Sequence, residues 1–578
     1  MDKFVNLHIK TNASIMSSVV QIESLVKKLS EYKQTAAAIV NQGNLFDAID
    51  FYKAMNENGI KPILGCEFNV VESFEENKQY DSLVLIAKNN DGWKNLKKLV
   101  TLSNKPEHYY YVPRISYKLI EENRDSLICL SGDQNGRFIK LINDDRIKEA
   151  EEFALYLKGL FPNDLYIEVF ANQFKRIEYI RKHSREIADR THIPCTAVSD
   201  TRYIEPEDCH ILEVAMCINS GKNMSDPVSD EFTKGRRTLF SNDYYLKRFD
   251  DVSEIFTEME IASAQEIAYF CNVEIDFKNA HVPKYHKTEG SKDSYEHLRK
   301  AIYGGLKERN ISVDNSQYID RIKKELKDIK EESLEDYFLI LWDILRWCKS
   351  QNIRTGLGRG SVGGSLIAYL LSITEIDPIK YGLMFERFYN AGRKGSLPDI
   401  DTDVEIDRRE DVIAYIRETF GENRVCQMLT LNRLSTKSVL KDVGKVFEVN
   451  FDEMNIITDY VPFNAESLKD AVEKSPELKT YQQKYKKIFT VAEKLEGIIK
   501  SKGSHAAGVV IFDEDFESGC VPLAYDAANE KLTTGFDMYT IDNLKYLKLD
   551  ILGLRTISLL KSTEKLVNKQ DNGVLINA

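Results

Sequence analysis

The sequence predicts a multidomain α/β protein, and three observations support this fold class. The chain has 578 residues, too many for one hydrophobic core, and this length implies about three or four domains. Residues 333–349 carry apolar side chains at the spacing of an amphipathic helix. Residues 399–404 alternate carboxylates with neutral or apolar side chains, as an extended strand does. The fold must therefore contain both helices and strands.

The composition is that of ordinary globular material, with 43% hydrophobic and 29% charged residues. No apolar run is long enough to span a bilayer, and the N-terminus lacks a secretion signal, so we expect a cytoplasmic protein without a membrane partner. The net charge of −12 argues against indiscriminate binding to nucleic acid. It is a sum over the whole chain, however, and does not exclude local basic surfaces that bind nucleic acid. Nine cysteines without a Cys-X-X-Cys pair indicate neither a zinc site nor a disulfide framework.

The most informative segment is the run of three aspartates that follows Pro398. Asp399, Asp401 and Asp403 would lie on one side of a strand, roughly 6 to 7 Å apart, and would repel one another without a cation between them. Mg²⁺ is the natural candidate because it prefers oxygen ligands. A solvated edge or loop, or a calcium loop, gives the same pattern, although no glycine and distal glutamate follow at the spacing of a calcium-binding loop.

A glycine-rich loop precedes the aspartates by about 40 residues. It follows the helix expected from residue 333, where Ser333 and Asp336 suggest a capping box, and it leads into an apolar helical run over 366–371. Five glycines in residues 356–364 allow close approach to a ligand, and Arg359 adds a fork for phosphate oxygens. A flexible turn is the plain alternative. Together with the aspartates, however, a phosphate cradle predicts phosphoryl or nucleotidyl transfer.

Six motifs, in order along the chain, resemble the signatures of the bacterial DNA polymerase III alpha subunit family, of the DnaE type. They are residues 356–365, 373–378, 383–388, 392–403, 505–510 and 548–555. The resemblance implies that Asp401, Asp403 and Asp550 hold two Mg²⁺ ions, and that Asp399 is a structural member. It assigns nucleotide binding to Gly358, Arg359, Gly360, Ser361, Ser365, Lys548, Arg393 and Lys394. Lys548 would equally serve as a counter-charge for Asp550.

A lysine stripe marks the segment 431–499. Lys437, Lys441 and Lys445 recur every four residues and would share one helix face, which either follows a DNA backbone or is simply solvated. In the family this segment is the thumb. The resemblance thus favours contact with DNA phosphates, and binding that tolerates any sequence and weakens with salt.

The resemblance also implies a domain order. We expect a distorted (β/α) barrel-like PHP domain over 1–275, followed by a nucleotidyltransferase-like palm of mixed sheet and helices over 276–430 and 500–565. The helical thumb would be inserted at 431–499, and 566–578 would begin the fingers domain. In the PHP domain His8, Glu67 and Asp200 match the family's metal ligands. The remaining expected ligands are replaced by Lys10, Asn41, Gln42, Ser82, Asp133 and Arg202, so we expect no metal there.

The sequence therefore predicts the N-terminal portion of a DNA-directed DNA polymerase that uses primed template DNA and dNTPs. The fingers and clamp-binding regions of the family are expected either on a separate chain or lost by truncation. Two other hypotheses stay open. One is a non-catalytic subunit for DNA binding or assembly, and the other is a phosphoesterase acting through the first domain, which the lost ligands disfavour.

Overall fold

The computed structural model describes residues 3–75, 79–229, 235–239, 241–287, 290–389, 398 and 400–570. The chain forms two compact units, each built from segments distant in sequence. Unit 1 comprises Met1–Ile275, Thr430–Gly503 and Val521–Phe536, and unit 2 comprises Asp276–Leu429, Ser504–Cys520 and Asp537–Ala578. Within the described ranges, no helix has the length and apolar composition needed to cross a bilayer.

Unit 1 is dominated by a barrel-like sheet in the order β8-β7-β6-β4-β3-β2-β1-β9, with β5 paired to β3. β8 and β9 occupy opposite ends of this order, yet only Ser199 separates them in sequence, so the two edges of the sheet are brought together. The strands are β1 (Asn6–Ile9), β2 (Ala36–Gln42), β3 (Lys61–Val71), β4 (Asp81–Ala87), β5 (Arg114–Ser116), β6 (Leu127–Leu130), β7 (Leu165–Phe170), β8 (Cys195–Val198) and β9 (Asp200–Thr201). The expected barrel-like PHP fold is thus confirmed.

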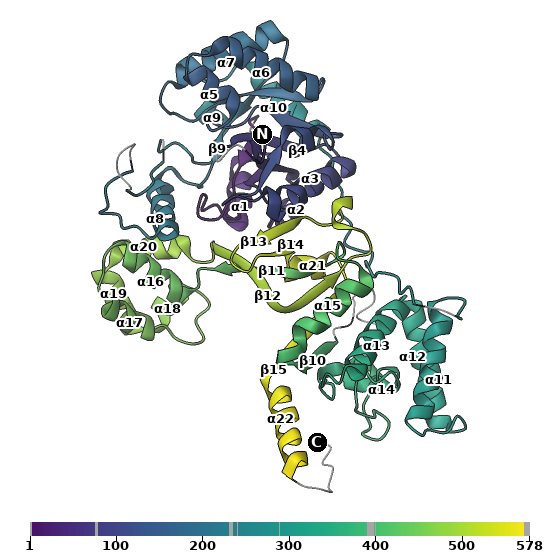
Figure 1. Cartoon of the computed structure of the whole chain (residues 1–578). Helices are drawn as coiled ribbons and strands as arrows, with labels where there is room; N and C mark the ends of the chain where they lie inside the picture. The colour runs from purple at the N-terminus through teal and green to yellow at the C-terminus, as the bar shows by residue number, and fades with distance from the viewer. Residues whose placement is uncertain are drawn as a thin grey trace. The chain divides into compact units, whose positions relative to one another are not determined.

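Helices cover this sheet, and α5, α6 and α7 lie side by side (Figure 1). The strands are buried almost throughout, which explains their apolar, β-branched composition. The helices are α1 (Ile22–Tyr32), α2 (Ala48–Glu57), α3 (Asn90–Ser103), α4 (Tyr117–Glu121), α5 (Arg137–Asn143), α6 (Ile147–Leu160), α7 (Ile177–Thr191), α8 (Cys209–Ser220), α9 (Phe249–Val252) and α10 (Glu258–Phe270).

The later segments of unit 1 add a helical subdomain and a hairpin. The apolar faces of α16 and α20 pack against α8 in one hydrophobic cluster. The helices are α16 (Thr436–Val446), α17 (Phe451–Asp459), α18 (Leu468–Lys474), α19 (Pro476–Lys484) and α20 (Lys486–Leu495), and the hairpin is β13 (Leu523–Asp526) with β14 (Lys531–Asp537). The hairpin docks on α3, where the hydroxyl of Thr101 accepts from the Leu523 N–H at 3.1 Å.

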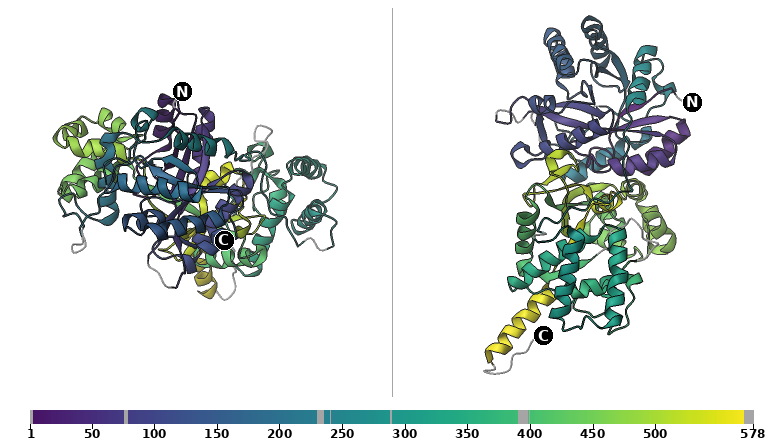
Figure 2. Two further views of the ribbon diagram at one scale, coloured as in Figure 1. Left: turned by 90° about the horizontal axis from the view of Figure 1, so that it is seen from above. Right: turned by 90° about the vertical axis from the view of Figure 1, so that its right-hand side faces the viewer.

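Unit 2 combines a layer of helices with a mixed sheet. Figure 2 shows the helices of residues 294–350, in teal, packed side by side. The helices are α11 (Ser294–Glu308), α12 (Ser316–Glu331), α13 (Glu335–Ser350), α14 (Leu366–Leu370), α15 (Arg409–Phe420), α21 (Met538–Asn543) and α22 (Arg555–Gln570). The strands are β10 (Asp401–Glu405), β15 (Lys548–Leu554), β12 (Ile499–Ile511) and β11 (Val425–Arg433), neighbours in that order. β11 and β12 continue from unit 2 into unit 1.

The helix α13 forms as predicted from the sequence, but its predicted N-terminal cap does not. α13 buries the predicted apolar positions Tyr337, Phe338, Leu341, Leu345 and Cys348, and these belong to the core of the unit. The capping box, however, is wrong. α13 begins after Leu334 without a side-chain cap, and the backbone of Ser333 is left-handed at φ 55°, where a serine cannot serve as an N-cap.

Candidate active site

The candidate active site begins with the ladder between β10 and β15. The two strands run parallel, and Asp401 pairs directly with Asp550, which brings their Cα atoms within about 4.8 Å. Thr402 and Val404 point into the core, so Asp401 and Asp403 share the opposite, partly exposed face. The same alternation in β15 buries Leu549 and Ile551. Both strands therefore present their carboxylates on one face of the sheet.

Arg359 joins the two aspartates of β10. Its Nη2 lies 3.2 Å from Oδ1 of Asp401, and its Nε lies 3.2 Å from Oδ1 of Asp403. The guanidinium is half exposed, whereas the Asp403 side chain is only 11% exposed. A cation thus occupies the position between the carboxylates where the alternating pattern requires one. Because the guanidinium is half exposed, solvent screens its ion pairs and weakens them.

The glycine-rich loop is attached to the aspartate strand by the backbone. The N–H of Gly356 donates to the carbonyl of Asp403 at 2.9 Å, and the N–H of Glu405 donates to the carbonyl of Arg354 at 3.1 Å. A Cβ on Gly356 would lie 2.9 Å from Cβ of Asp403, closer than real Cβ atoms approach. Only glycine allows the loop to pack this closely against the strand.

Gly358 forms the bend that carries the loop away from the strand. Its φ of +93° lies in the region that favours glycine, and a Cβ there would meet Oγ1 of Thr374 at 2.3 Å. Oγ1 of Thr374 in turn donates to the carbonyl of Leu357 at 3.0 Å. The residues after this bend, Gly360 to Gly364, form a 3-10 turn that leads into α14. The bend at Gly358 and the turn after it therefore give the loop a defined path beside β10.

The N-terminus of α14 is already occupied by a carboxylate. Glu325 of α12 is fully buried and accepts from the Leu366 N–H at 2.9 Å and from the Ile367 N–H at 3.0 Å. Ser365 also donates its hydroxyl to Glu325, at 2.9 Å, and has no exposed surface. These contacts differ from the predicted role of Ser365 in phosphate binding. Here Ser365 and Glu325 stabilise the base of the loop, and the N–H groups of α14 are not presented to a ligand.

Glu325 was not predicted from the sequence as part of this site. It pairs with Arg321 one turn earlier on α12, and Nη2 of Arg321 donates to the carbonyl of Gly364 at 2.6 Å. Burial raises the pKa of Glu325, although the Ile367 and Leu366 N–H groups and Arg321 oppose this. The Arg-X-X-X-Glu spacing in the sequence indicates only an ordinary helical ion pair. Its role depends on a loop about 40 residues away.

Lys548 lies on the same face as Asp550, two residues earlier in β15. Its Nζ lies 3.2 Å from Oδ2 of Asp542 in α21. Asp542 is therefore an ion-pair partner of Lys548, so the ammonium is not reserved for Asp550. Gly360 and Ser361 lie in the turn that follows the bend at Gly358. Asp399, Arg393 and Lys394 lie outside the described residues.

A metal ion would find its ligands only partly assembled. Within the ranges that the structure describes, no three His, Cys, Asp or Glu side chains converge in the way that a metal site requires. Arg359 explains this for the aspartates, because it holds two of them in place of an ion. The donor chemistry nevertheless fits Mg²⁺, which takes carboxylate oxygens and completes its shell with substrate phosphates and water.

The lysine stripe of the predicted thumb lies on α16 in unit 1. Lys437, Lys441 and Lys445 are all exposed, and the opposite face of the helix is buried in the cluster with α8. The stripe is thus a solvent-facing basic row, as its spacing predicts. Contact with DNA stays a prediction, because an exposed row of lysines is also consistent with a solvated face.

The residues of the PHP domain at the family's expected ligand positions include a buried cluster of opposite charges. Nζ of Lys10 lies 2.8 Å from Glu67 and 3.5 Å from both Asp133 and Asp200. Arg202 completes the cluster at 2.6 Å from Asp200. Although burial lowers the pKa of Lys10, Asp200, Glu67 and Asp133 raise it above its usual value. Two of the residues that replace the expected ligands, Lys10 and Arg202, therefore place cations among these carboxylates.

His8 lies beside this cluster and makes two contacts with carboxylates. Its Nδ1 lies 2.8 Å from Glu168, and its Nε2 lies 3.1 Å from Glu67. Burial lowers the pKa of His8, but Glu168 and Glu67 outweigh burial and raise the pKa to about 10. Glu168 was not identified from the sequence. A protonated His8 is a poor metal ligand, because metal binding requires the neutral imidazole. The expectation that no metal binds here stays a prediction.

Comparisons with known proteins match two parts of the chain to family models. A family model described as the bacterial DNA polymerase III alpha NTPase domain matches residues 296–553, and the PHP domain model matches residues 6–172. A putative metal-dependent phosphoesterase of known structure from Bifidobacterium adolescentis covers 34% of the chain at 14% identity, with a TM-score of 0.23. A likeness of that size supports no conclusion about this chain.

Curated relatives match nearly the whole chain. DNA polymerase III subunit alpha of Aquifex aeolicus is 34% identical and matches over 99% of this chain and 53% of its own length. The subunit of Borreliella burgdorferi is 33% identical, over 98% and 49%, and that of Campylobacter jejuni is 32% identical, over 100% and 51%. The chain spans about half the length of the curated relatives it matches. With its matches to the PHP and NTPase domain models and to these relatives along nearly its whole length, the chain belongs to the family of bacterial DNA polymerase III alpha subunits.

Proposed function

We propose that the chain carries the nucleotidyl-transfer centre of a DNA-directed DNA polymerase, which extends a primer 3′-hydroxyl with dNTPs during DNA replication. The observation that supports this most strongly is the β10–β15 ladder, where Asp401 and Asp550 are direct neighbours beside Asp403. Primed template DNA is the proposed partner. The regions that the relatives have in addition would act with this centre, on the same or a separate chain.

Asp401, Asp403 and Asp550 would hold two Mg²⁺ ions, and the ion pairs of Arg359 support this because a cation already fits between two of the carboxylates. When bound, the ions lower the pKa of the primer hydroxyl and neutralise charge on the triphosphate and its pyrophosphate leaving group. Arg359 would then exchange its aspartates for phosphate oxygens, which its forked guanidinium matches well. Gly358, Gly360 and Ser361 would supply backbone N–H groups to the same phosphates.

The remaining site residues would orient the loop, the triphosphate and the DNA. Glu325 fixes the base of the loop through Ser365, so that the bend at Gly358 stays beside β10. Lys548 would place a positive charge near the triphosphate, and Asp542 would orient it. The lysines of α16 would contact duplex phosphates without reading the sequence.

A non-catalytic DNA-binding or assembly subunit is the second candidate function. The observation in its favour is the same contact of Arg359, because a site that never binds metal would keep its aspartates neutralised in this way. The two functions differ in the fate of Arg359 when substrate is present. Only the polymerase requires Mg²⁺ and a triphosphate to displace it.

Primer extension tests the proposal. The assay uses labelled primed DNA, dNTPs and Mg²⁺, with the chain alone and with the remaining regions of an alpha-subunit relative supplied as a second polypeptide. Asp401→Asn and Asp550→Asn should each abolish extension, whereas Asp407→Asn should leave it unchanged, because Asp407 lies on the exposed turn after β10. Extension that persists in Asp401→Asn would refute the assigned centre. Salt-sensitive binding to primed DNA without any incorporation would favour the second candidate.

A further inference from the structure

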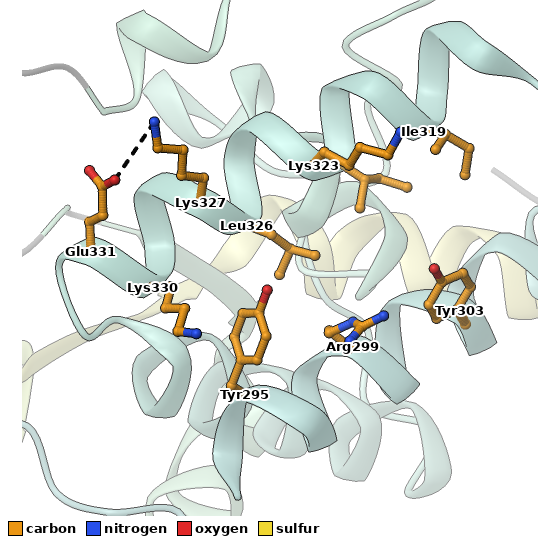
Figure 3. Close-up of a pocket in the computed structure, with 10 residues that line it drawn as sticks. Tyr295, Arg299, Tyr303, Ile319, Lys323, Leu326, Lys327, Lys330 and Glu331 are labelled. Carbon is orange, nitrogen blue, oxygen red and sulfur yellow. Dashed lines mark ion pairs between the residues drawn. The ribbon is translucent and has the colours of Figure 1, made fainter.

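A groove between α11 and α12 in unit 2 lies outside the site described above. It encloses about 610 Å³, and Figure 3 shows its lining from the two helices. The floor is apolar, with Ile319, Ile322 and Leu326 from α12. Its walls are cationic and aromatic. Four of the ten lining residues are lysine or arginine and one is acidic, in a chain whose net charge is −12.

The cations on the α12 side form a row. Lys323 and Lys327 are one turn apart, about 6 Å along the helix, and their side chains are 72% and 74% exposed. Lys323 lies 3.3 Å from Asp320, and Lys327 lies 3.8 Å from Glu331. Both are exposed pairs within one helix, and such pairs contribute only about 0.3–0.5 kcal/mol. Incoming phosphates can therefore replace these acidic partners.

The α11 side presents planar groups at a regular interval. Tyr295, Arg299 and Tyr303 are spaced by four residues, so they line one face of the helix over about 12 Å. The ring of Tyr303 is half exposed, and Nζ of Lys330 lies 4.7 Å from the ring centroid of Tyr295. An exposed tyrosine ring, such as that of Tyr303, and the plane of an arginine are groups on which unpaired bases stack.

We propose that this groove binds single-stranded DNA, with phosphates along Lys323 and Lys327 and bases against Tyr303 and Arg299. An acidic peptide would satisfy the lysines but would leave the row of planar side chains without a matching partner. The choice of DNA over other single strands rests on the proposed function. α12 also supplies Glu325 to the loop beside the aspartates, so the groove and that loop share one helix.

Fluorescence anisotropy with oligo(dT) of about eight nucleotides tests the groove. All proteins carry Asp401→Asn, and the buffer contains EDTA, so that neither metal nor catalysis contributes. Lys323→Ala/Lys327→Ala should reduce the slope of log K against log salt by about 1.4, since each phosphate contact contributes about 0.7. Tyr303→Ala should weaken binding about tenfold, whereas Tyr303→Phe should not. Lys182→Ala and Tyr269→Ala, which remove exposed side chains from unit 1, are the matched controls.

Two further measurements separate the outcomes. An abasic oligomer should bind Tyr303→Ala and its parent equally, and iododeoxyuridine in the oligonucleotide should crosslink to peptides containing Tyr295 or Tyr303. Unchanged binding in both groove variants, or crosslinks only elsewhere, would overturn the proposal. Poly-glutamate that competes as well as oligo(dT), with no effect of Tyr303→Ala, would identify an acidic-peptide groove instead. Absence of primer extension by the chain with Asp401 intact, in the assay described above, together with intact oligonucleotide binding would count against the proposed function and leave the groove standing.

Discussion

Replacing Lys10 by methionine tests whether an ammonium group replaces metal in the PHP domain. Methionine has a similar length but no charge, so Glu67, Asp133 and Asp200 lose their central cation. At an effective dielectric constant of about 20, the three contacts at 2.8, 3.5 and 3.5 Å contribute roughly 15 kcal/mol of gross attraction. Most of this offsets the cost of desolvation. Removing one partner from a buried ion pair typically destabilises a protein by about 3–5 kcal/mol.

Tryptophan fluorescence can follow the unfolding of unit 1 alone. Of the chain's three tryptophans, only Trp93 belongs to unit 1, where it is buried in α3. In a Trp342→Phe/Trp347→Phe background, Lys10→Met should lower the apparent Tm by about 5–10 °C at pH 7. The loss should shrink below about pH 5, where an unpaired carboxylate takes up a proton. Lys182→Met, which removes an exposed lysine, is the control.

Two outcomes of the Lys10→Met measurement would refute the proposed role of the ammonium. If Lys10→Met unfolds within about 1 kcal/mol of the parent protein at pH 7, the ammonium does not organise the cluster. A loss that stays constant between pH 4 and pH 7 would point instead to a packing defect, because a cavity does not titrate.

Three other predictions follow from contacts in the two units. The pKa of His8 is about 10 in the folded chain against about 6.5 in the unfolded chain, so the stability that protonated His8 contributes is complete below pH 6.5 and is lost as the pH rises to 10. Urea unfolding at a series of pH values should show this decline in the free energy of unfolding. The same decline in His8→Gln would contradict its assignment to His8. Lys437→Ala/Lys441→Ala/Lys445→Ala should reduce the salt slope for duplex DNA by about 2.7, and an unchanged slope would mean a solvated face. Glu325→Ala should raise the KM for dNTP more than it lowers kcat, because Glu325 holds the base of the loop. Glu308→Ala, which removes an exposed side chain, is the control and should change neither constant. An effect of Glu325→Ala on kcat alone would show that Glu325 does not position the loop.

Local patterns in the sequence predicted the elements that carry the site. Three patterns show which face of one element is buried: the helical spacing of α13, the alternation in β10 and the apolar run of α14. Each pattern is contained in a short stretch of consecutive residues. The capping box of α13 failed because the backbone of Ser333 is left-handed, a conformation that the sequence alone does not reveal.

Contacts between distant segments were the part that sequence reasoning could not supply. Glu325 and Ser365 are about 40 residues apart, and Glu168 and His8 are 160 residues apart. Each looks like an ordinary polar residue until the fold brings its partner to it. Arg359 illustrates the same limit, because its predicted phosphate role did not reveal that it bridges Asp401 and Asp403.

The most direct measurement of the proposed centre is the binding of Mn²⁺, a paramagnetic substitute for Mg²⁺, followed by electron paramagnetic resonance with primed DNA and dNTP present. We expect two ions per chain whose spectra are coupled, and loss of that coupling in Asp401→Asn and in Asp550→Asn but not in Asp407→Asn. Arg359→Ala should bind Mn²⁺ more tightly than the parent before dNTP is added, because the competing guanidinium is gone. Mn²⁺ binding that is unchanged in Asp401→Asn would contradict the assignment of the metal centre to the β10–β15 ladder.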